Sequence, residues 1–246
     1  MHPQTLFSAF LALAATGIAA PAEVVSSLTA RAVVNHDSLN PIGKTIQGGA
    51  IGSAIDKFQP LLHIAHGCQP YTAVDKQGNT SGGLQDSGTT AGGCKDTSKG
   101  QTYARARVFN GKLAIMYAWY WPKDQPADGN LVSGHRHDWE SVVVFIDNYQ
   151  SSSPSIYGAA ASGHGDFKKT RTPQRNGNNP MAEYFTSGGK NHELQFKTSP
   201  GRTYWIYDWD AMTNEARRGL TDTKWGSANV PFIDSNFVNN LNKAWM

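Results

Sequence analysis

One stretch in the middle of the chain is rich in aromatic and β-branched residues, and it constrains the fold more than any other feature. Tyr103–Val108 alternates in polarity, Lys112–Trp121 is aromatic and β-branched, and Asn110-Gly111 between them is a hairpin turn signal. The run Ser141–Asp147 is apolar on both faces, as expected for a central strand that is covered on each side. The sequence therefore predicts a β-hairpin followed by a fully buried strand.

The amino-acid composition agrees with a β architecture. The 246 residues include 25 Gly, 12 Pro, 7 Trp, 9 Tyr and 10 Phe, which favours turns and strands and excludes an all-α fold. Further short strands are expected at Ser155–Ala161 and Glu193–Thr198. Helices are expected from Ser53 to Pro60, from Asp210 to Gly219, and after Asp234, where Phe237, Leu241 and Trp245 recur at helical spacing. We predict a mainly β fold with peripheral α, a central β-sandwich flanked by helices.

Three segments are predicted to lack regular structure. Cys68–Gly100 contains several glycines without hydrophobic periodicity, Pro122–Ser133 holds two prolines and a glycine, and Lys168–Asn179 is polar. The long apolar runs of the chain also stay far below the roughly twenty residues that a membrane-spanning helix needs. No transmembrane segment is therefore expected.

The N-terminus is typical of a secretory signal peptide. Residues 1–20 contain no Asp, Glu, Lys or Arg, and the apolar run Leu6–Ala15 is followed by small residues suited to cleavage between residues 19 and 22. A buried helix is the alternative interpretation of this segment. The prediction is a secreted protein with a single domain over residues 21–246. Its formal net charge of +3 is too mild to indicate a nucleic-acid partner.

The chain contains two cysteines, so only one pairing is available if they are oxidised. An exported chain favours a disulfide between Cys68 and Cys94, with two buried thiols as the alternative. The sequon Asn79-Thr80-Ser81 lies inside the loop that this disulfide would close, and Asn79 is a candidate for glycosylation.

The segment His135–Glu140 concentrates chemistry-bearing side chains within six positions. In a strand that begins near Arg136, Asp138 and Glu140 point to one face. Two adjacent carboxylates need a compensating positive charge, and oxygen ligands favour Mg²⁺, Ca²⁺ or Mn²⁺. Asp124 could supply a third carboxylate to this site. His135 can reach the same face only if the chain bends before Arg136, and Gly134 permits such a bend. In the alternative interpretation, Arg136 pairs with Asp138 and no metal binds.

Two further histidines, His164 and His192, lie beside glycines or polar residues where a ligand could approach. The sequence contains no G-x-S-x-G elbow, no phosphate-binding loop and no dinucleotide-binding fingerprint. An H-x-H-x-D zinc-hydrolase spacing fits only weakly, because Asp138 comes one residue too early.

The heptapeptide Gly134-His135-Arg136-His137-Asp138-Trp139-Glu140 resembles the hallmark of the necrosis- and ethylene-inducing-peptide-like proteins, which are secreted cytolysins. Further matching stretches carry the resemblance over nearly all of the chain from Asp56 to Trp245. They are Gly67-Cys68, Ala114–Tyr120, Pro122-Lys123-Asp124 and Trp225–Phe232. The cysteine pair resembles that of the single-disulfide type 1 of this family.

The resemblance implies a fold similar to actinoporins and fungal lectins, and a non-enzymatic function. It implies one divalent cation, Mg²⁺ or Ca²⁺ with Mn²⁺ possible, held by Asp124, His135, Asp138 and Glu140. It further implies binding to the sugar-bearing inositol phosphorylceramide headgroups of the plant plasma membrane. The candidate headgroup-binding residues are His164, His192, Arg136 and His137.

The predicted protein is thus a secreted phytotoxic cytolysin that acts in the host extracellular space, as a monomer in solution, and disrupts the membrane surface. Two other functions stay open from the sequence. One is a secreted metal-dependent hydrolase with His137 or His164 as general base. The other is a non-toxic carbohydrate-binding protein.

Overall fold

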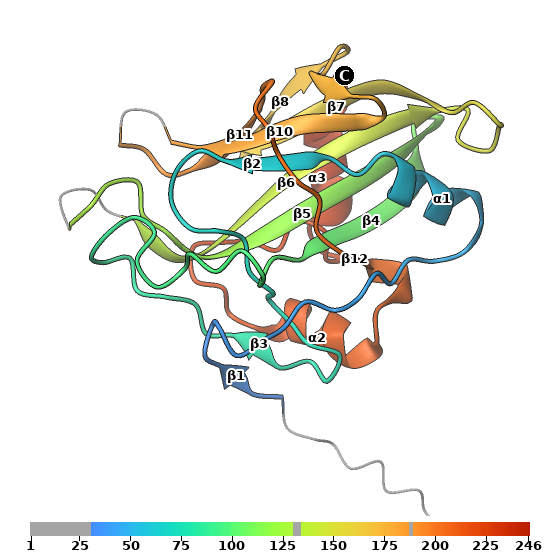
Figure 1. Ribbon diagram of the computed structural model, residues 1–246. Helices are drawn as coiled ribbons and strands as arrows, with labels where there is room; N and C mark the ends of the chain where they lie inside the picture. The colour runs from blue at the N-terminus through green and yellow to red at the C-terminus, as the bar shows by residue number, and fades with distance from the viewer. Residues whose placement is uncertain (1–30, 130–133, 187–188) are drawn as a thin grey trace, which may run out of the picture. The chain divides into compact units, whose positions relative to one another are not determined.

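A computed structural model describes residues 31–129, 134–186 and 189–246. The fold is built around a large six-stranded sheet (Figure 1). In spatial order its strands are β12 (Ile206–Asp208), β4 (Thr102–Phe109), β5 (Lys112–Asp124), β6 (His135–Asp147), β7 (Ser155–Gly163) and β8 (Asp166–Thr170). The predicted signal peptide, residues 1–20, and its cleavage region lie outside the described residues.

A smaller sheet and four short helical segments complete the described part of the chain. The small sheet consists of β11 (Glu193–Phe196), β10 (Asn179–Phe185) and β2 (Leu61–Ile64), with β9 (Arg175–Asn176) paired to β10. β1 (Val33–Val34) and β3 (Thr80–Ser81) form a separate parallel pair. The helices are α1 (Gly49–Lys57), α2 (Asn214–Asp222), α3 (Phe237–Ala244) and the 3-10 turn η1 (Trp209–Ala211).

The predicted hairpin and central strand are confirmed. β4 and β5 pair antiparallel, and the turn residues Asn110 and Gly111 have φ values of 48° and 77°, as a two-residue hairpin turn of this type requires. β6 lies between β5 and β7, and its segment Ser141–Ile146 is buried. Burial on both faces explains why this strand carries an unbroken apolar run.

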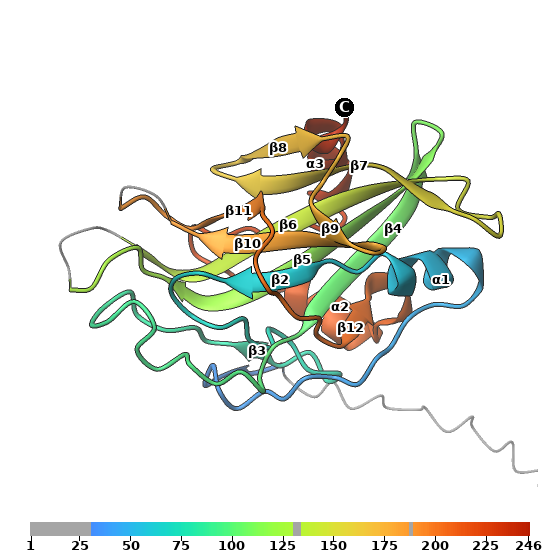
Figure 2. The same ribbon diagram turned by 45° about the horizontal axis from the view of Figure 1, so that its top comes forward.

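The two faces of the large sheet are covered by different elements. In Figures 1 and 2, β2, β10 and β11 lie on one face, and α3 lies on the other. Tyr184 of β10 stacks on Trp121 of β5 with ring centroids 3.9 Å apart. On the opposite face, Phe145 of β6 contacts Trp245, just after α3, at 5.2 Å. The mainly β fold flanked by helices is therefore confirmed.

The boundaries of β5 differ from the prediction, which placed a loop from Pro122 onward. β5 continues to Asp124, and its ladder with β6 pairs Trp121 with Asp138 and Lys123 with Arg136. Pro122 is skipped between these pairs, which fits a residue that has no N–H to donate. The strand is therefore long enough to place Asp124 at the end of the sheet, opposite the first residue of β6.

Several strands and helix boundaries were not predicted correctly. The polar segment Lys168–Asn179 contains β9 and most of β8, whose lysines suit an exposed edge strand. The strands β2 and β10 were missed. The first helix begins at Gly49, not after Ser53, and α2 is capped by Thr213, whose Oγ1 accepts a hydrogen bond from Ala216 N at 3.1 Å. These ends depend on local hydrogen bonds that sequence patterns do not fix.

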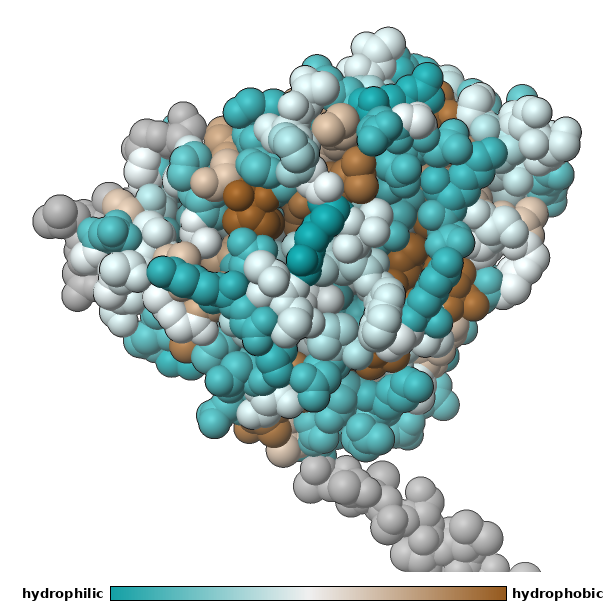
Figure 3. Space-filling model, viewed as in Figure 1, coloured by the Kyte–Doolittle hydropathy of each residue, from teal (hydrophilic) through white to brown (hydrophobic). Residues whose placement is uncertain are grey.

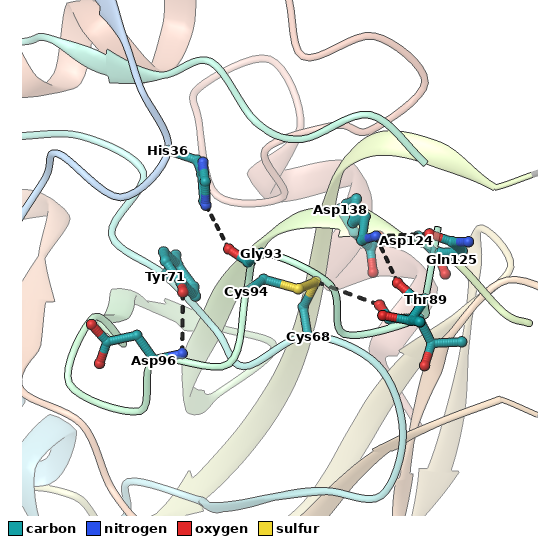
Figure 4. The surroundings of a disulfide bond; sticks show 12 residues. His36, Cys68, Tyr71, Thr89, Gly93, Cys94, Asp96, Asp124, Gln125 and Asp138 are labelled. Atoms are coloured by element: carbon teal, nitrogen blue, oxygen red, sulfur yellow. Dashed lines mark hydrogen bonds between the residues drawn. A yellow bond between two sulfur atoms is a disulfide. The ribbon is translucent and has the colours of Figure 1, made fainter. Parts of the chain in front are cut away.

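The disulfide between Cys68 and Cys94 is present, as predicted, with Cα atoms 5.0 Å apart (Figure 4). It joins two otherwise irregular segments that also meet through the backbone, where Gln69 N donates to Cys94 O at 2.9 Å. The ring of His36 is hydrogen-bonded to Gly93 O at 2.8 Å, and Asp96 N donates to Tyr71 OH at 3.2 Å. The bridge thus orders a loop region that has little regular structure.

Candidate metal and headgroup site

A cavity of about 800 Å³ opens where β5 ends and β6 begins. Asp124 and His135, the last and first residues of these two strands, are paired across the ladder. Its acidic side is lined by Asp124, His135, Asp138, Glu140 and His192, with His164 at the β7–β8 turn. The structure therefore brings the four residues predicted as metal ligands into one cavity.

Three of these residues form a tight group. Asp124, His135 and Asp138 each offer one ligand atom, and these atoms all lie within 4.8 Å of one another. The backbone of His137 explains how His135 and Asp138 meet, since its φ of 61° breaks the regular alternation of β6. The sequence analysis placed the bend that His135 needs before Arg136, at Gly134. In the structure the left-handed residue is His137, after Arg136.

His135 is oriented by a backbone contact. Its Nδ1–H donates to the carbonyl oxygen of His137 at 2.7 Å, so in the neutral imidazole Nε2 carries the lone pair that can bind a metal. That Nε2 lies 3.7 Å from Oδ2 of Asp124. The left-handed residue therefore both turns the strand and selects the tautomer of the neighbouring imidazole.

Asp124 is held by a residue from a distant part of the chain. Its Oδ2 accepts a hydrogen bond from His192 N at 2.8 Å, and its Oδ1 accepts another from His192 Nδ1–H. The imidazole of His192 stacks on Tyr184 with ring centroids 4.5 Å apart. A Cβ atom at Gly67 would come within 2.9 Å of His192 Nε2, so a glycine at that position leaves room for the ring.

Asp138 is buried beside the same aromatic stack. Its Oδ2 accepts a hydrogen bond from Tyr184 OH at 2.7 Å. Burial, and next the nearby charge of Asp124, raise the pKa of Asp138 from 3.8 to about 7. The carboxyl is therefore poised to exchange a proton for a cation near neutral pH.

Glu140 lies deeper along the same face of β6 and outside the group of three. It accepts a hydrogen bond from Ser162 Oγ, and burial followed by the charge of Asp138 raises its pKa well above the ordinary value. Glu193, next to His192 in the chain, is ion-paired to Lys168 at 2.6 Å and lies 3.6 Å from Nε2 of the cavity-lining His164. The acidic side of the cavity therefore holds more carboxylates than the tight group alone.

Arg136 and His137, two of the predicted headgroup-binding residues, do not point into this cavity. The Arg136 guanidinium donates to Gly82 O at 2.8 Å and to Gln85 Oε1, so it does not neutralise Asp138. The ring of His137 is buried against Trp225, and burial lowers its pKa to about 4. The metal-free interpretation, in which Arg136 pairs with Asp138, therefore does not hold. Neither residue lines this cavity, and a contact of Arg136 or His137 with the headgroup stays a prediction.

The glycosylation candidate is partly buried. Asn79 Nδ2 donates to Asp75 Oδ2 at 2.8 Å, and its Oδ1 accepts from Ala32 N at 2.9 Å. The side chain therefore helps to hold the β1–β3 region, and its glycosylation stays a prediction.

Sequence reasoning missed three residues that shape the cavity. Tyr184, Ser162 and Glu193 each contact a carboxylate or a histidine of the site. Glu193 follows His192 directly, but no local pattern links the β7, β10 and β11 segments to β6. The pairing of β7 with β6 and the packing of the small sheet on the large sheet bring these residues together.

The donor set fits a divalent cation. Two carboxylates and one imidazole are hard and borderline donors that suit Mg²⁺, Ca²⁺ or Mn²⁺. In the part of the chain that the structure describes, no lysine or arginine forms an ion pair with Asp124, Asp138 or Glu140. Burial, and next the charge of a neighbouring carboxylate, raise the pKa values of Asp138 and Glu140.

Comparison with solved structures defines the class of protein. A structure reported as a "Toxin fold as basis for microbial attack and plant defense" aligns with a TM-score of 0.81 and 42% identity, covering 87% of this chain and 100% of that one. NLPPya in complex with mannosamine aligns with a TM-score of 0.81 and 43% identity over the same shares of the two chains. The fold of this chain is therefore the toxin fold of these structures.

The protein family that this chain matches and its related sequences agree with this class of protein. Residues 52–244 match the family "Necrosis inducing protein (NPP1)", and the chain belongs to this family. The chain is 40% identical to NLP effector protein 10 of Phytophthora capsici over 228 residues, covering 91% of this chain and 96% of the relative. A crystal structure of the non-toxic HaNLP3 protein aligns with a TM-score of 0.81 and 41% identity, covering 85% of this chain and 98% of that one. The predicted family and its single-disulfide type are confirmed.

Proposed function

We propose that this chain is a secreted phytotoxic cytolysin that binds sugar-bearing inositol phosphorylceramide headgroups in the plant plasma membrane and disrupts the bilayer. In this proposal residues 1–20 are the signal peptide, and residues 21–246 form the single cytolysin domain that acts in the host extracellular space. The observation that carries it is the group of Asp124, His135 and Asp138, in which both aspartates are buried and neither forms an ion pair with a lysine or arginine among the described residues. A relative of the same fold binds the amino sugar mannosamine.

The acidic group would hold one divalent cation, Mg²⁺ or Ca²⁺, with Mn²⁺ as a third candidate. When bound, the ion supplies coordination positions for sugar hydroxyl oxygens. Asp124, His135 and Asp138 provide the ligand atoms, and Glu140 offers a further carboxyl group at the next position on the same face of β6. Tyr184 and His192 keep the two aspartates in place.

Of the predicted headgroup-binding histidines, His164 keeps that role in the proposal. Its side chain is 47% exposed in the turn between β7 and β8, next to the cavity. His192 is almost fully buried, so it orients Asp124 and does not offer a surface to the headgroup. His164 therefore lies at the surface of the site, and His192 lies in its interior.

The proposal places the protein at the membrane surface as a monomer that approaches from solution. Among the described residues no helix has the length and apolar character needed to cross a membrane. The face in Figure 3 is mostly hydrophilic, with hydrophobic residues in small areas between hydrophilic ones. Such a face suits a protein that first recognises a polar headgroup.

Dye release from vesicles tests this function. Calcein-loaded vesicles with the sugar-bearing inositol phosphorylceramide fraction should leak on addition of the protein, and vesicles without that fraction should stay intact. EDTA should stop the leakage, and Mg²⁺ or Ca²⁺ should restore it better than Zn²⁺, because oxygen ligands dominate the site. Full leakage in excess EDTA, with an ion-free protein by metal analysis, would reject the role of the cation.

A non-toxic carbohydrate-binding protein is the second candidate, because the non-toxic HaNLP3 shares the fold at 41% identity. This candidate predicts headgroup binding without dye release in the same assay. The hydrolase alternative has lost one of its two bases, since His137 lies buried against Trp225, away from the cavity. Accumulation of a soluble product in the presence of Zn²⁺ would support the hydrolase alternative.

A further inference from the structure

The cavity continues from the acidic group to a second wall of different chemistry. Besides the carboxylates, five asparagines from the C-terminal part of the chain line it. These five, the amide wall, are Asn229, Asn236, Asn239, Asn240 and Asn242. An amide offers both donors and acceptors without a net charge, which matches the hydroxyl groups of a sugar. The wall therefore differs from the acidic side in what it can bind.

The two walls lie on opposite faces of β6. Asp138 and Glu140 point toward the small sheet, where Tyr184 of β10 contacts Asp138. Helix α3 packs on the other face, as the contact of Phe145 with Trp245 shows. β6 pairs with β7 only from Val142 onward, so the first half of β6 leaves an edge around which the cavity can extend.

Four of the five asparagines belong to α3 or to its N-cap residue, Asn236. Asn236, Asn239, Asn240 and Lys243 recur at positions i, i+3, i+4 and i+7, which places them on one face of the helix. The opposite face of α3 is buried. Lys243 Nζ donates to Gly165 O at 2.8 Å and fastens the helix to the β7–β8 turn. The wall is thereby held in a fixed position at the rim of the cavity.

Two of the asparagines are structural, and the others are available to a ligand. Asn236 Nδ2 donates to Val230 O and Asn240 Nδ2 donates to Pro231 O, each at 2.9 Å. Asn239 and Asn242 are exposed, and their side chains form no hydrogen bond with the described part of the chain. Trp139, which also lines the cavity, is 93% buried, and its Nε1 has no hydrogen-bond partner among the described residues. Unpaired buried donors of this kind are uncommon without a ligand or water.

The volume of the cavity exceeds what the cation needs. An ion with six waters would fill only about 200 Å³ at about 30 Å³ per water. The remaining space of a cavity of about 800 Å³ is in the range that takes larger organic ligands. The carboxylates on the acidic side disfavour an anionic group there, so the lining of the cavity suits a neutral or basic polyol.

We infer that the amide wall is a second sugar subsite, so that the protein binds two neighbouring sugar residues of one headgroup. One residue sits at the acidic group, and the adjacent one is bound by Asn239 and Asn242. This inference rests on the proposed headgroup binding and adds that recognition extends beyond a single sugar. It also assigns a function to α3, which lies far in sequence from the acidic residues.

The test compares the variant Asn239→Ala/Asn242→Ala with the wild type and with Asn178→Ala, an exposed asparagine in the turn before β10. Alanine favours helix more than asparagine does, so the double variant should fold normally. Two binding measurements are made on each protein with Mg²⁺ present. One uses mannosamine in solution, and the other uses sedimentation with vesicles that carry the sugar-bearing inositol phosphorylceramide fraction.

The double variant should bind these vesicles about tenfold more weakly, as expected for two lost hydrogen bonds, and should bind mannosamine as the wild type does. Asn178→Ala should match the wild type in both measurements. Unchanged vesicle binding by the double variant would overturn the second subsite. Loss of mannosamine binding as well would also overturn it, because the wall would then belong to the first subsite. If the wild type itself bound neither probe, the proposed function would fail, and that result is visible without any variant.

Discussion

His192 and Asp124, which lie 68 residues apart, are joined by two hydrogen bonds, from the backbone N–H and from the ring Nδ1–H of the histidine to the two oxygens of the carboxylate. This contact fastens the end of β5 to the start of β11. It also fixes the orientation of a carboxylate that belongs to the candidate metal site. The nearly complete burial of both side chains makes the contact insensitive to solvent.

We therefore expect His192→Ala to lower the affinity for Mg²⁺ by about 10-fold to 100-fold, the usual effect of removing a group that orients a metal ligand. Isothermal titration of the cation measures this, and dye release should fall in parallel. His192→Asn, which keeps the backbone contact and an amide donor, should recover part of the affinity. The exposed His66→Ala is the matched control, and equal losses in both variants would contradict a positioning role.

Asp138→Asn should abolish cation binding and dye release while leaving the fold intact. The asparagine has the same shape and can still accept the hydrogen bond from Tyr184, but it lacks the charge that holds the ion. Glu140→Gln should weaken both properties for the same electrostatic reason. Circular dichroism checks the fold, and Asp56→Asn, which removes an exposed ion pair with Lys44, should behave as the wild type. Full dye release by Asp138→Asn would remove this residue from the mechanism.

The pH dependence of stability should differ between the cation-free and the cation-loaded protein. The pKa of Asp138 is raised from 3.8 to about 7, so the folded state binds more protons than the unfolded state between these values. The contribution of this group to stability is therefore present at acid pH and is lost as pH rises toward about 7. Bound Mg²⁺ compensates the charge, because it takes the place of the proton.

Thermal melting measures this effect. In EDTA, Asp138→Asn should melt at a higher temperature than the wild type near neutral pH and at a similar temperature near pH 4. Added Mg²⁺ should raise the melting temperature of the wild type more at neutral pH than at acid pH. A stabilisation by Mg²⁺ that is equal at both pH values would contradict proton and cation competition at Asp138.

Loss of the disulfide should lower the free energy of unfolding. The bridge closes a loop with a sequence separation of 26, and loop-closure entropy predicts a loss of about 3.5 kcal/mol. Urea denaturation of Cys68→Ser/Cys94→Ser against the wild type measures this difference. Activity should persist at low temperature, because neither cysteine lines the cavity. Mass analysis that finds two free thiols in the secreted protein would show that the bridge does not form.

Local sequence patterns were sufficient to predict the hairpin of β4 and β5 and the buried strand β6. Asn110-Gly111 specifies the tight turn, and the unbroken apolar run of Ser141–Asp147 requires cover on both faces. The same alternation placed Asp138 and Glu140 on one face of β6. Each of these features depends on neighbours within a few residues, so a local sequence pattern is enough to reveal it.

Tertiary structure decided how the site is completed. The left-handed backbone at His137 brings His135 beside Asp138, against the alternation of a regular strand. His192 and Tyr184 reach the two aspartates because β10 and β11 pack on the large sheet. The amide wall reaches the cavity because α3 packs on the opposite face of that sheet. Such contacts join residues tens of positions apart, and their cost in chain entropy is compensated only when the whole core packs, so no local pattern in the sequence could specify them.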